Sequence, residues 1–267
     1  MGDTITRENT VVTLDGKFWK KDSILKQMDD DEFYYGYLGQ NALSSSSVKV
    51  LNKSPKAYAK SLRFGTKRTG AMTLGWLLHL AVFEPEKFSH LNWVDASTRN
   101  TKIYKEAFSE NPMTFLRKEY EDTMRMADAI YSNYDAEMLI KGLDYEKPAI
   151  GDIDGIPFRA KADAIGANGI VDLKTTTGLA EGSFPYNARK YGYASQVYIY
   201  CNLFDIQYKD FKFLCICKET KDIAIYDVSE EFYFEGERLV SSAIETYREW
   251  FSDGGKNIDQ YIIKGTL

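Results

Sequence analysis

The sequence has too few cysteines for a metal cluster or a disulfide framework. Its 267 residues include three, Cys201, Cys215 and Cys217, and each lies among apolar residues. Three thiols cannot supply a four-cysteine site, and apolar surroundings are typical of reduced, buried cysteines. We therefore expect no iron–sulfur cluster, no structural zinc site and no set of disulfides.

Long apolar runs are also missing. No uninterrupted run approaches the roughly 20 residues that a membrane-spanning helix needs. The first apolar cluster, Val11 to Leu14, is too short for the core of a secretion signal. We expect a cytoplasmic protein without a membrane partner.

The chain lacks a general excess of positive charge, because 34 Lys and Arg face 39 Asp and Glu, a net charge of −5. This balance argues against a surface that is basic all over. The charge is uneven, however, since no Asp or Glu occurs between Asn41 and Phe83. The cations in that basic segment are Lys49, Lys53, Lys56, Lys60, Arg63, Lys67 and Arg68. It is either a phosphate-facing surface or an ordinary solvated helix face.

What is present predicts an α/β fold with a mixed sheet flanked by helices. Residues 1–40 are expected to form an N-terminal arm, and residues 41–267 the main domain with a helical insertion at about 99–142. The arm holds a hairpin that turns at Asp15-Gly16 and an acidic, then aromatic, stretch over 29–37. The remaining expected elements are helices at 46–63 (two short ones), 71–83, 187–203 and 230–251, and strands at 145–152, 157–165, 170–174, 208–217 and 222–228.

Two carboxylates and an ammonium close neighbouring strands of the predicted sheet. Asp163 ends one apolar strand, and Asp172-Leu173-Lys174 follows the apolar run 169–171. A carboxylate in such a strand is partly buried and needs a cation, a hydrogen-bond network or a raised pKa. Carboxylates that hold Mg²⁺ beside a lysine are the minimal set for metal-assisted phosphodiester cleavage. Each aspartate taken alone would be an ordinary turn or cap residue.

Further candidates flank this motif. His79 interrupts the apolar helix 71–83 and is either a metal ligand or a core histidine bonded to a backbone carbonyl. Glu146 begins the first strand and would add a third carboxylate or align water, in competition with the other acids nearby.

Polar residues on two other elements complete the candidate set. Gln196 and Tyr200 are four residues apart and share one helix face, where they would otherwise be surface residues. Arg159 and Lys161 alternate with Asp163 and would either meet phosphate oxygens or pair with the acids.

The order of these segments resembles the PD-(D/E)XK nuclease superfamily, and within it the exonuclease VIII (RecE-like) group of phage recombination exonucleases. The resemblance extends from about Leu43 to about Phe251. The segments that carry it are Gly-Trp-Leu-Leu-His-Leu-Ala-Val-Phe-Glu-Pro-Glu-Lys-Phe, Glu146, Phe-Arg-Ala-Lys-Ala-Asp, Ile-Val-Asp-Leu-Lys-Thr-Thr and Gln-Val-Tyr-Ile-Tyr. The first 40 residues are not covered. The fold implied is a restriction-endonuclease-like core with a helical lobe.

The resemblance also implies roles for individual residues. His79, Asp163, Asp172 and the Leu173 carbonyl would bind Mg²⁺, with Mn²⁺ as a substitute. Lys174 would activate or orient the water, and Glu146 matches the family by its order and rough spacing. Gln196 and Tyr200 would support the site and contact DNA. Further DNA contacts are expected from Lys53, Lys60, Arg63, Arg159, Lys161, Thr175 and Arg189.

The function that this set implies is Mg²⁺-dependent digestion of one strand of linear duplex DNA from an end, in the 5′ to 3′ sense, leaving single-stranded tails for recombination. Such relatives form rings and work beside a single-strand annealing protein, so a homo-oligomer and such a partner are expected, in the host cytoplasm if the protein is phage-encoded. The alternatives are a structure- or site-specific endonuclease of the same fold, and a catalytically silent DNA-binding or assembly protein.

Overall fold

The computed structural model describes residues 9–66, 68–179, 183–263 and 265–266, and its centre is a five-stranded mixed sheet. The strand order follows the sequence, and β7 with β8 is the one parallel pair in this sheet. The strands are β5 (Asp144–Ile153), β6 (Ile156–Gly166), β7 (Gly169–Thr176), β8 (Phe211–Cys217) and β9 (Ile223–Asp227). The predicted three-strand meander and mixed sheet are confirmed.

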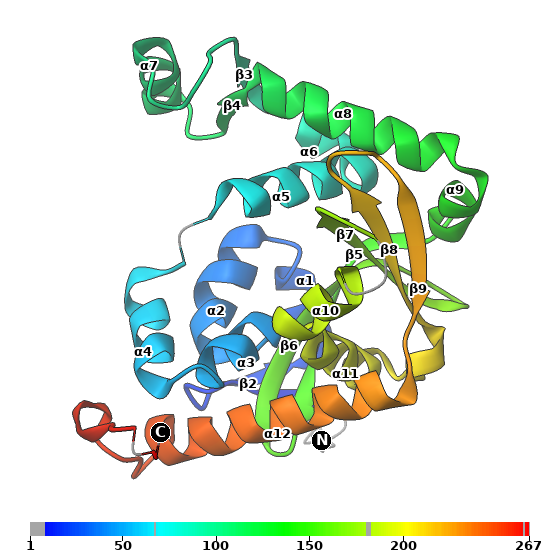
Figure 1. Ribbon diagram of the computed structural model, residues 1–267. Coiled ribbons are helices and arrows are strands. Elements are labelled where there is room, and N and C mark those ends of the chain that lie inside the picture. Colours follow the sequence, from blue (N-terminus) through cyan, green and yellow to red (C-terminus); the bar gives the residue numbers. More distant parts are fainter. Residues whose placement is uncertain (1–8, 67, 180–182, 264, 267) are drawn as a thin grey trace, which may run out of the picture.

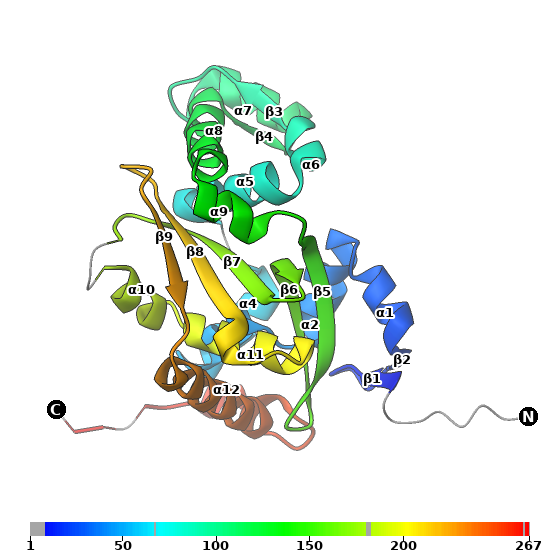
Figure 2. The ribbon, with the colours of Figure 1, turned by 90° about the vertical axis from the view of Figure 1, so that its right-hand side faces the viewer.

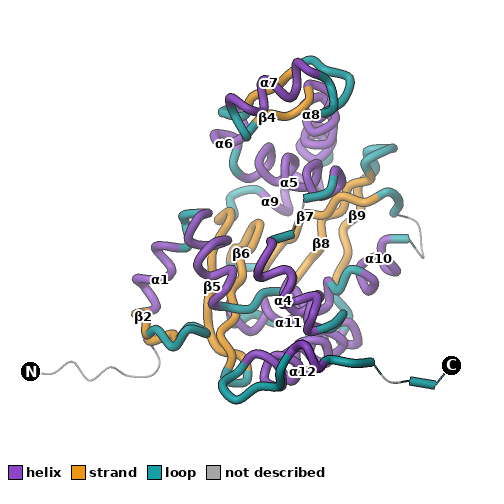
Figure 3. Tube along the Cα trace, turned by 90° about the vertical axis from the view of Figure 1, so that its left-hand side faces the viewer, coloured by secondary structure: helices purple, strands orange, loops and turns teal. Residues whose placement is uncertain are grey.

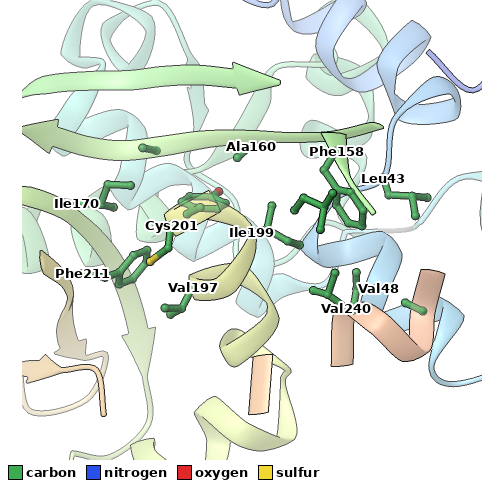
Figure 4. Packing of buried hydrophobic residues seen from close by; sticks show 14 of the residues in the cluster. Leu43, Val48, Phe158, Ala160, Ile170, Val197, Ile199, Cys201, Phe211 and Val240 are labelled. Carbon is green, nitrogen blue, oxygen red and sulfur yellow. The ribbon is translucent and has the colours of Figure 1, made fainter. Parts of the chain in front are cut away.

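Helices cover both faces of the sheet, as Figure 2 shows. On one face lie α3 (Ser45–Leu51), α11 (Tyr193–Phe204) and α12 (Glu230–Phe251). Their apolar side chains interlock with those of β6, β7 and β8 in the larger core (Figure 4). The labelled members of that core are Leu43, Val48, Phe158, Ala160, Ile170, Val197, Ile199, Cys201, Phe211 and Val240. This core fixes α11 against the strands that carry the candidate motif.

The opposite face is covered by α5 (Gly70–Phe83), α8 (Arg117–Ser132) and α9 (Tyr134–Ile140). α5 corresponds to the apolar helix expected at 71–83, and its position explains why it is apolar on nearly every side. Leu78 packs with Leu173 and Leu214 of the sheet, whereas Leu77 and Leu80 pack against the lobe beyond. Two cores therefore share one helix.

The lobe projects away from the sheet beyond α5 (Figure 1) and contains α6 (Pro85–Ser89) and α7 (Lys102–Glu110). It also holds β3 (Asn92–Val94) and β4 (Thr114–Leu116), paired in parallel. Within the helical insertion expected at about 99–142, only β4 departs from the helical pattern among the described elements, because a three-residue strand is too short to show an alternating pattern.

The helix predicted at 187–203 is two helices, α10 (Phe184–Lys190) and α11. Gly192 interrupts them with a φ of 73°, a left-handed conformation that glycine adopts without strain. The break turns Tyr191 and Tyr193 toward the candidate site, whose cavity both residues line.

The N-terminal part packs beside β5, as Figure 3 shows for α1 (Lys21–Gln27). The predicted hairpin is confirmed as β1 (Thr10–Val12) and β2 (Phe18–Lys20). The acidic–aromatic stretch forms η2 (Glu32–Tyr37), a π-helix, followed by α2 (Leu38–Asn41). Residues 1–8 of the arm lie outside the described residues.

The two short helices predicted in 46–63 are α3 and α4 (Pro55–Phe64), capped by Ser44 and Ser54. Two short 3₁₀ turns, η3 (Tyr208–Asp210) and η4 (Ile258–Gln260), complete the described elements. None of the described helices combines the length and the apolar character that crossing a membrane requires.

Candidate metal centre

The sheet opens where the motif lies. β6 and β7 pair from Gly166 and Gly169 up to Ala164 and Val171, and the pairing ends before Asp163 and Asp172. At that point Asp163 Oδ2 accepts a hydrogen bond from the Leu173 N–H at 2.8 Å. A carboxylate has taken the place of a main-chain acceptor, so both aspartates sit at a fork between two strands.

Glu146 faces Asp163 across the neighbouring strand pair. The residues on either side of it, Tyr145 and Lys147, pair with Ala164 and Ala162. Glu146 itself has a φ of 49°, which is uncommon outside glycine. Like charges opposite each other destabilise a sheet, and strained backbone of this kind is concentrated at functional sites. A cation between the two carboxylates would offset their repulsion.

His79 reaches this pair from α5. Its Nδ1 lies 3.4 Å from Asp163 Oδ1, and its Nε2 lies 2.9 Å from the Leu173 carbonyl oxygen. His79, Glu146 and Asp163 each offer a ligand atom within 4.8 Å of the others. His79 therefore contacts a backbone carbonyl, as a core histidine would, and also belongs to a cluster of possible metal ligands.

Without a metal ion, protons on His79 and Glu146 reduce the negative charge of the cluster. Burial disfavours the charged imidazole, but the attraction of Asp163 outweighs it and raises the pKa of His79 to about 9. Burial, together with Asp163, raises the pKa of Glu146 to about 8. Burial alone would raise the pKa of Asp163, yet His79 and Lys174 hold it below its usual value. Asp163 is thus the ionised member of the cluster at neutral pH.

Asp172 and Lys174 form a second group on the other side of the fork. Asp172 is fully buried, and its Oδ1 accepts a hydrogen bond from Gln196 Nε2 at 2.5 Å. Its Oδ2 contacts the Lys174 ammonium and has no hydrogen-bond partner of normal geometry. Burial raises the pKa of Asp172 to about 6. Burial would lower the pKa of Lys174, but Asp172 and Asp163 more than offset this and hold it above its usual value. Lys174 is therefore a fixed positive charge.

Tyr200, Arg159 and Lys161 line the same cavity from α11 and β6. The Tyr200 hydroxyl donates to the Lys161 carbonyl at 2.9 Å, which fixes α11 to β6. Arg159 is buried and donates to the Tyr34 carbonyl at 2.6 Å, which ties the arm to the sheet. Lys161 pairs with Asp31 of the arm at 3.2 Å.

Most of these groups line a cavity of about 560 Å³, namely His79, Glu146, Arg159, Lys161, Asp163, Lys174, Gln196 and Tyr200. Sequence reasoning missed part of its wall. The missed residues are Asp31, Tyr34, Tyr35, Ser44, Ser45, Ser46, Gly75, Trp76, Leu80, Glu84, Tyr191, Gly192 and Tyr193. The acidic stretch followed by aromatic residues at 29–37 was the available signal for the arm's share.

Several predicted DNA contacts lie elsewhere. Lys53, Lys60 and Arg63 are exposed on or near α4 and line neither this cavity nor the one beside it, whereas Lys49 of the basic segment lines both. Arg189 pairs with Glu231 at 3.2 Å and with Glu235, both on α12. Thr175 lines the neighbouring cavity. Lys67 lies outside the described residues.

The donor set suits a hard divalent cation. Carboxylate and carbonyl oxygens are the ligands that Mg²⁺ and Mn²⁺ prefer, and one imidazole is compatible with both. His79 and Asp163, expected as ligands, lie in the cluster with Glu146, and the Leu173 carbonyl adjoins it. Asp172, also expected as a ligand, has its oxygens turned to Lys174 and Gln196.

Residues 44–256 match the model of a family described as a PDDEXK-like domain of unknown function (DUF3799). The chain belongs to this family. The match covers the forked strands, His79 and α11, so the expected membership of the PD-(D/E)XK group is confirmed at this level. It does not extend to the arm that lines one wall of the cavity.

A solved structure shares this fold. A protein from Eubacterium rectale, named "Putative exonuclease", is 16% identical, has a TM-score of 0.63 and covers 89% of this chain and 95% of its own. A second structure, SSO0001, is 18% identical over 65% of this chain and 86% of its own, but its TM-score of 0.31 is too low to indicate a shared fold. No curated protein has a significant match to the chain.

Proposed function

We propose that this protein is a Mg²⁺-dependent deoxyribonuclease. The observation that carries the proposal is the fork of β6 and β7, where His79, Glu146 and Asp163 converge beside the Asp172–Lys174 ion pair. Membership of a PDDEXK-like family supports it, as does the fold shared with a protein named as an exonuclease.

Each group has a distinct task under this proposal. His79, Glu146, Asp163 and the Leu173 carbonyl would hold the cation, which lowers the pKa of bound water and offsets charge on the phosphate. Lys174 would position the attacking water and stabilise the negative charge that develops. Gln196 keeps Asp172 oriented toward Lys174, and Tyr200 holds α11 on β6.

The finer proposal is processive digestion of one strand from a duplex end, 5′ to 3′, to give single-stranded tails for recombination. This proposal is based on the resemblance to RecE-like exonucleases. On the same basis we propose a ring-shaped homo-oligomer, a single-strand annealing protein as partner, and a location in the cytoplasm of a phage host. We further propose that residues 41–267 form the nuclease domain and residues 1–40 an arm that borders its site.

Incubation with covalently closed circular DNA distinguishes an exonuclease from an endonuclease of the same fold. An exonuclease digests linear duplex and leaves the closed circle intact. Nicking or linearisation of the circle would favour the endonuclease instead. A catalytically silent DNA-binding protein would bind both substrates and release no nucleotides.

The direct test is nucleotide release from linear duplex in Mg²⁺ and in chelator, with Asp172→Ala and Lys174→Ala beside the parent protein. We expect loss in chelator and a fall of at least about 10²-fold for each variant, since each removes electrostatic stabilisation in a buried site. Release by Asp172→Ala at the parent rate would exclude this site.

His79 needs its own experiment because it also fits a core role. We expect His79→Ala to bind Mn²⁺ about tenfold more weakly or worse, as ligand loss does elsewhere. If the variant folds and binds Mn²⁺ as tightly as the parent, His79 is a structural histidine.

A further inference from the structure

A second cavity, of about 500 Å³, adjoins the metal centre. Six residues border both cavities: Lys49, Gly75, His79, Lys174, Tyr191 and Tyr193. The second cavity continues from there along the end of β7 and the start of α5, past Thr175 and Thr69 to Lys218. Each cavity falls within the roughly 300–1,000 Å³ range of ligand sites.

The two cavities differ in charge. The first has Asp31, Glu84, Glu146 and Asp163 in its wall. The second has no carboxylate among the described residues that line it, but three lysines, Lys49, Lys174 and Lys218. Its other polar lining is Thr69, His79, Thr175, Thr176, Thr177, Asn187 and the two tyrosines. Cations and neutral donors without competing acids are what a phosphate backbone requires.

Two of these lysines are available to a ligand. In the described part of the chain, no ion pair involves Lys49 or Lys218. The Lys49 ammonium lies 4.9 Å from the centre of the ring of Tyr191, an exposed residue that lines both cavities. An aromatic ring beside a cation is a common platform for an unpaired base.

Gly75 keeps the border open. It lies one helical turn before His79 on α5, although glycine weakens a helix interior relative to alanine. A Cβ at this position would lie 3.5 Å from Thr175 Oγ1, an ordinary contact, so methyl fits here. A longer side chain would extend into the space between the cavities.

We propose that the two cavities form one channel for a single DNA strand, with the phosphates of the strand beside the scissile bond held in the second cavity, whose described lining residues include no carboxylate. The choice of DNA as the ligand of this channel depends on the proposed nuclease function. It assigns Lys218 to phosphate binding and Gly75 to the passage past the metal centre.

Binding is measured with a short fluorescent single-stranded oligonucleotide in Ca²⁺, for Lys218→Ala, Lys218→Arg and Lys118→Ala. Lys118 is exposed on α8 and lines neither cavity. We expect Lys218→Ala to weaken binding about 3- to 10-fold and to reduce the slope of log Kd against log salt by about 0.7, the value for one phosphate neutralised on a single strand. Lys218→Arg should bind like the parent.

A Lys218→Ala protein that binds like Lys118→Ala would overturn the channel, as would a parent protein that does not bind the oligonucleotide. The second test compares Gly75→Ala with Gly75→Leu on linear DNA and on bis(p-nitrophenyl) phosphate, a diester that needs the metal centre but no channel. We expect the loss on DNA to grow with side-chain size and, for Gly75→Leu, to exceed the loss on the small diester roughly tenfold, because a long strand is mispositioned.

Equal losses on both substrates would mean that Gly75 acts on the metal centre, and the channel would be wrong. The failure of the proposed function has a different signature. If the parent protein hydrolyses neither substrate, the nuclease assignment is wrong. Oligonucleotide binding in Ca²⁺ would still decide whether the channel exists. Thermal unfolding of each variant identifies any that does not fold.

Discussion

Glu146 and His79 make the stability of the metal-free protein depend on pH. Burial raises the pKa of Glu146 from 4.5 to about 8, and Asp163 outweighs burial to raise that of His79 from 6.5 to about 9. Both groups bind protons more tightly in the folded than in the unfolded state. Their contribution to stability is therefore complete below the unfolded pKa values and is lost as pH rises toward 9.

In chelator, the Tm of the protein is expected to fall between pH 6 and pH 9, and Mn²⁺ to restore it at the alkaline end, where the ligands are deprotonated. Glu146→Gln should flatten the fall, because it removes one of the two groups. Thermal unfolding across this window, with and without Mn²⁺, measures both effects. A Tm that rises with pH in chelator would contradict the charge assignment.

At this scale the sequence indicated the chemistry but not the geometry. Asp163, Asp172 and Lys174 could be found because carboxylates and a lysine at strand ends form a recognisable pattern. The role of Glu146 could not be assigned from the sequence, since several acids nearby competed for it. Its left-handed backbone conformation also has no sequence signal at a non-glycine residue. Nor could the partner of Arg159 be identified, because the Tyr34 carbonyl lies 125 residues away in the chain.

Among the elements, α11 is the one that places the polar support of the site. It lies so close to α12 that a Cβ at Gly236 would approach the Ala194 carbonyl oxygen to 2.1 Å. Only a glycine allows this approach. The contact therefore sets the position of Gln196 on α11, and hence its hydrogen bond to Asp172.

Gly236→Ala should destabilise the protein by about 1–3 kcal/mol, which is typical of overpacking, and lower its Tm by several degrees. Gly75→Ala is the matched change, because it also replaces a helical glycine but adds a methyl with room around it. Thermal unfolding of both variants makes the comparison. Equal Tm values would mean that the α11–α12 contact relaxes without cost.

Elements with strong local signals were predictable. The N-caps of α3, α4 and α5 are Ser44, Ser54 and Thr69, residue types that favour helix starts, and apolar alternation indicated the meander. The β3–β4 pair was not predictable, because each strand has only three residues and pairs with a strand that is not adjacent in sequence. The break at Gly192 was hidden by helix formers on both sides.

For the whole molecule, the proposed function requires duplex DNA to reach the site across the surface. Lys60 and Arg63 are exposed, carry no carboxylate partner among the described ion pairs and lie on α4, away from the cavity wall. We propose that they bind phosphates of the duplex away from the cleaved bond.

Replacing Lys60 and Arg63 together by alanine should reduce the salt slope of duplex binding by roughly 1.8, because each phosphate that a cation neutralises contributes about 0.9 to the slope. The control is Lys105→Ala with Lys118→Ala, two exposed lysines of the lobe. Binding is measured in Ca²⁺ over a range of salt. An unchanged slope would assign the basic segment to an ordinary solvated helix face.

Nucleotide release from linear duplex DNA in Mg²⁺ by Asp163→Asn is the decisive test of the proposed metal centre. Asp163 joins the fork, His79 and Leu173, and is the ionised carboxylate of the cluster. Asp128→Asn, an exposed change of the same chemistry on α8, is the control. We predict that the rate of nucleotide release by Asp163→Asn is at least about 10²-fold lower than that of the parent protein, while the control keeps the parent rate. Release by a folded Asp163→Asn protein at the parent rate would contradict it.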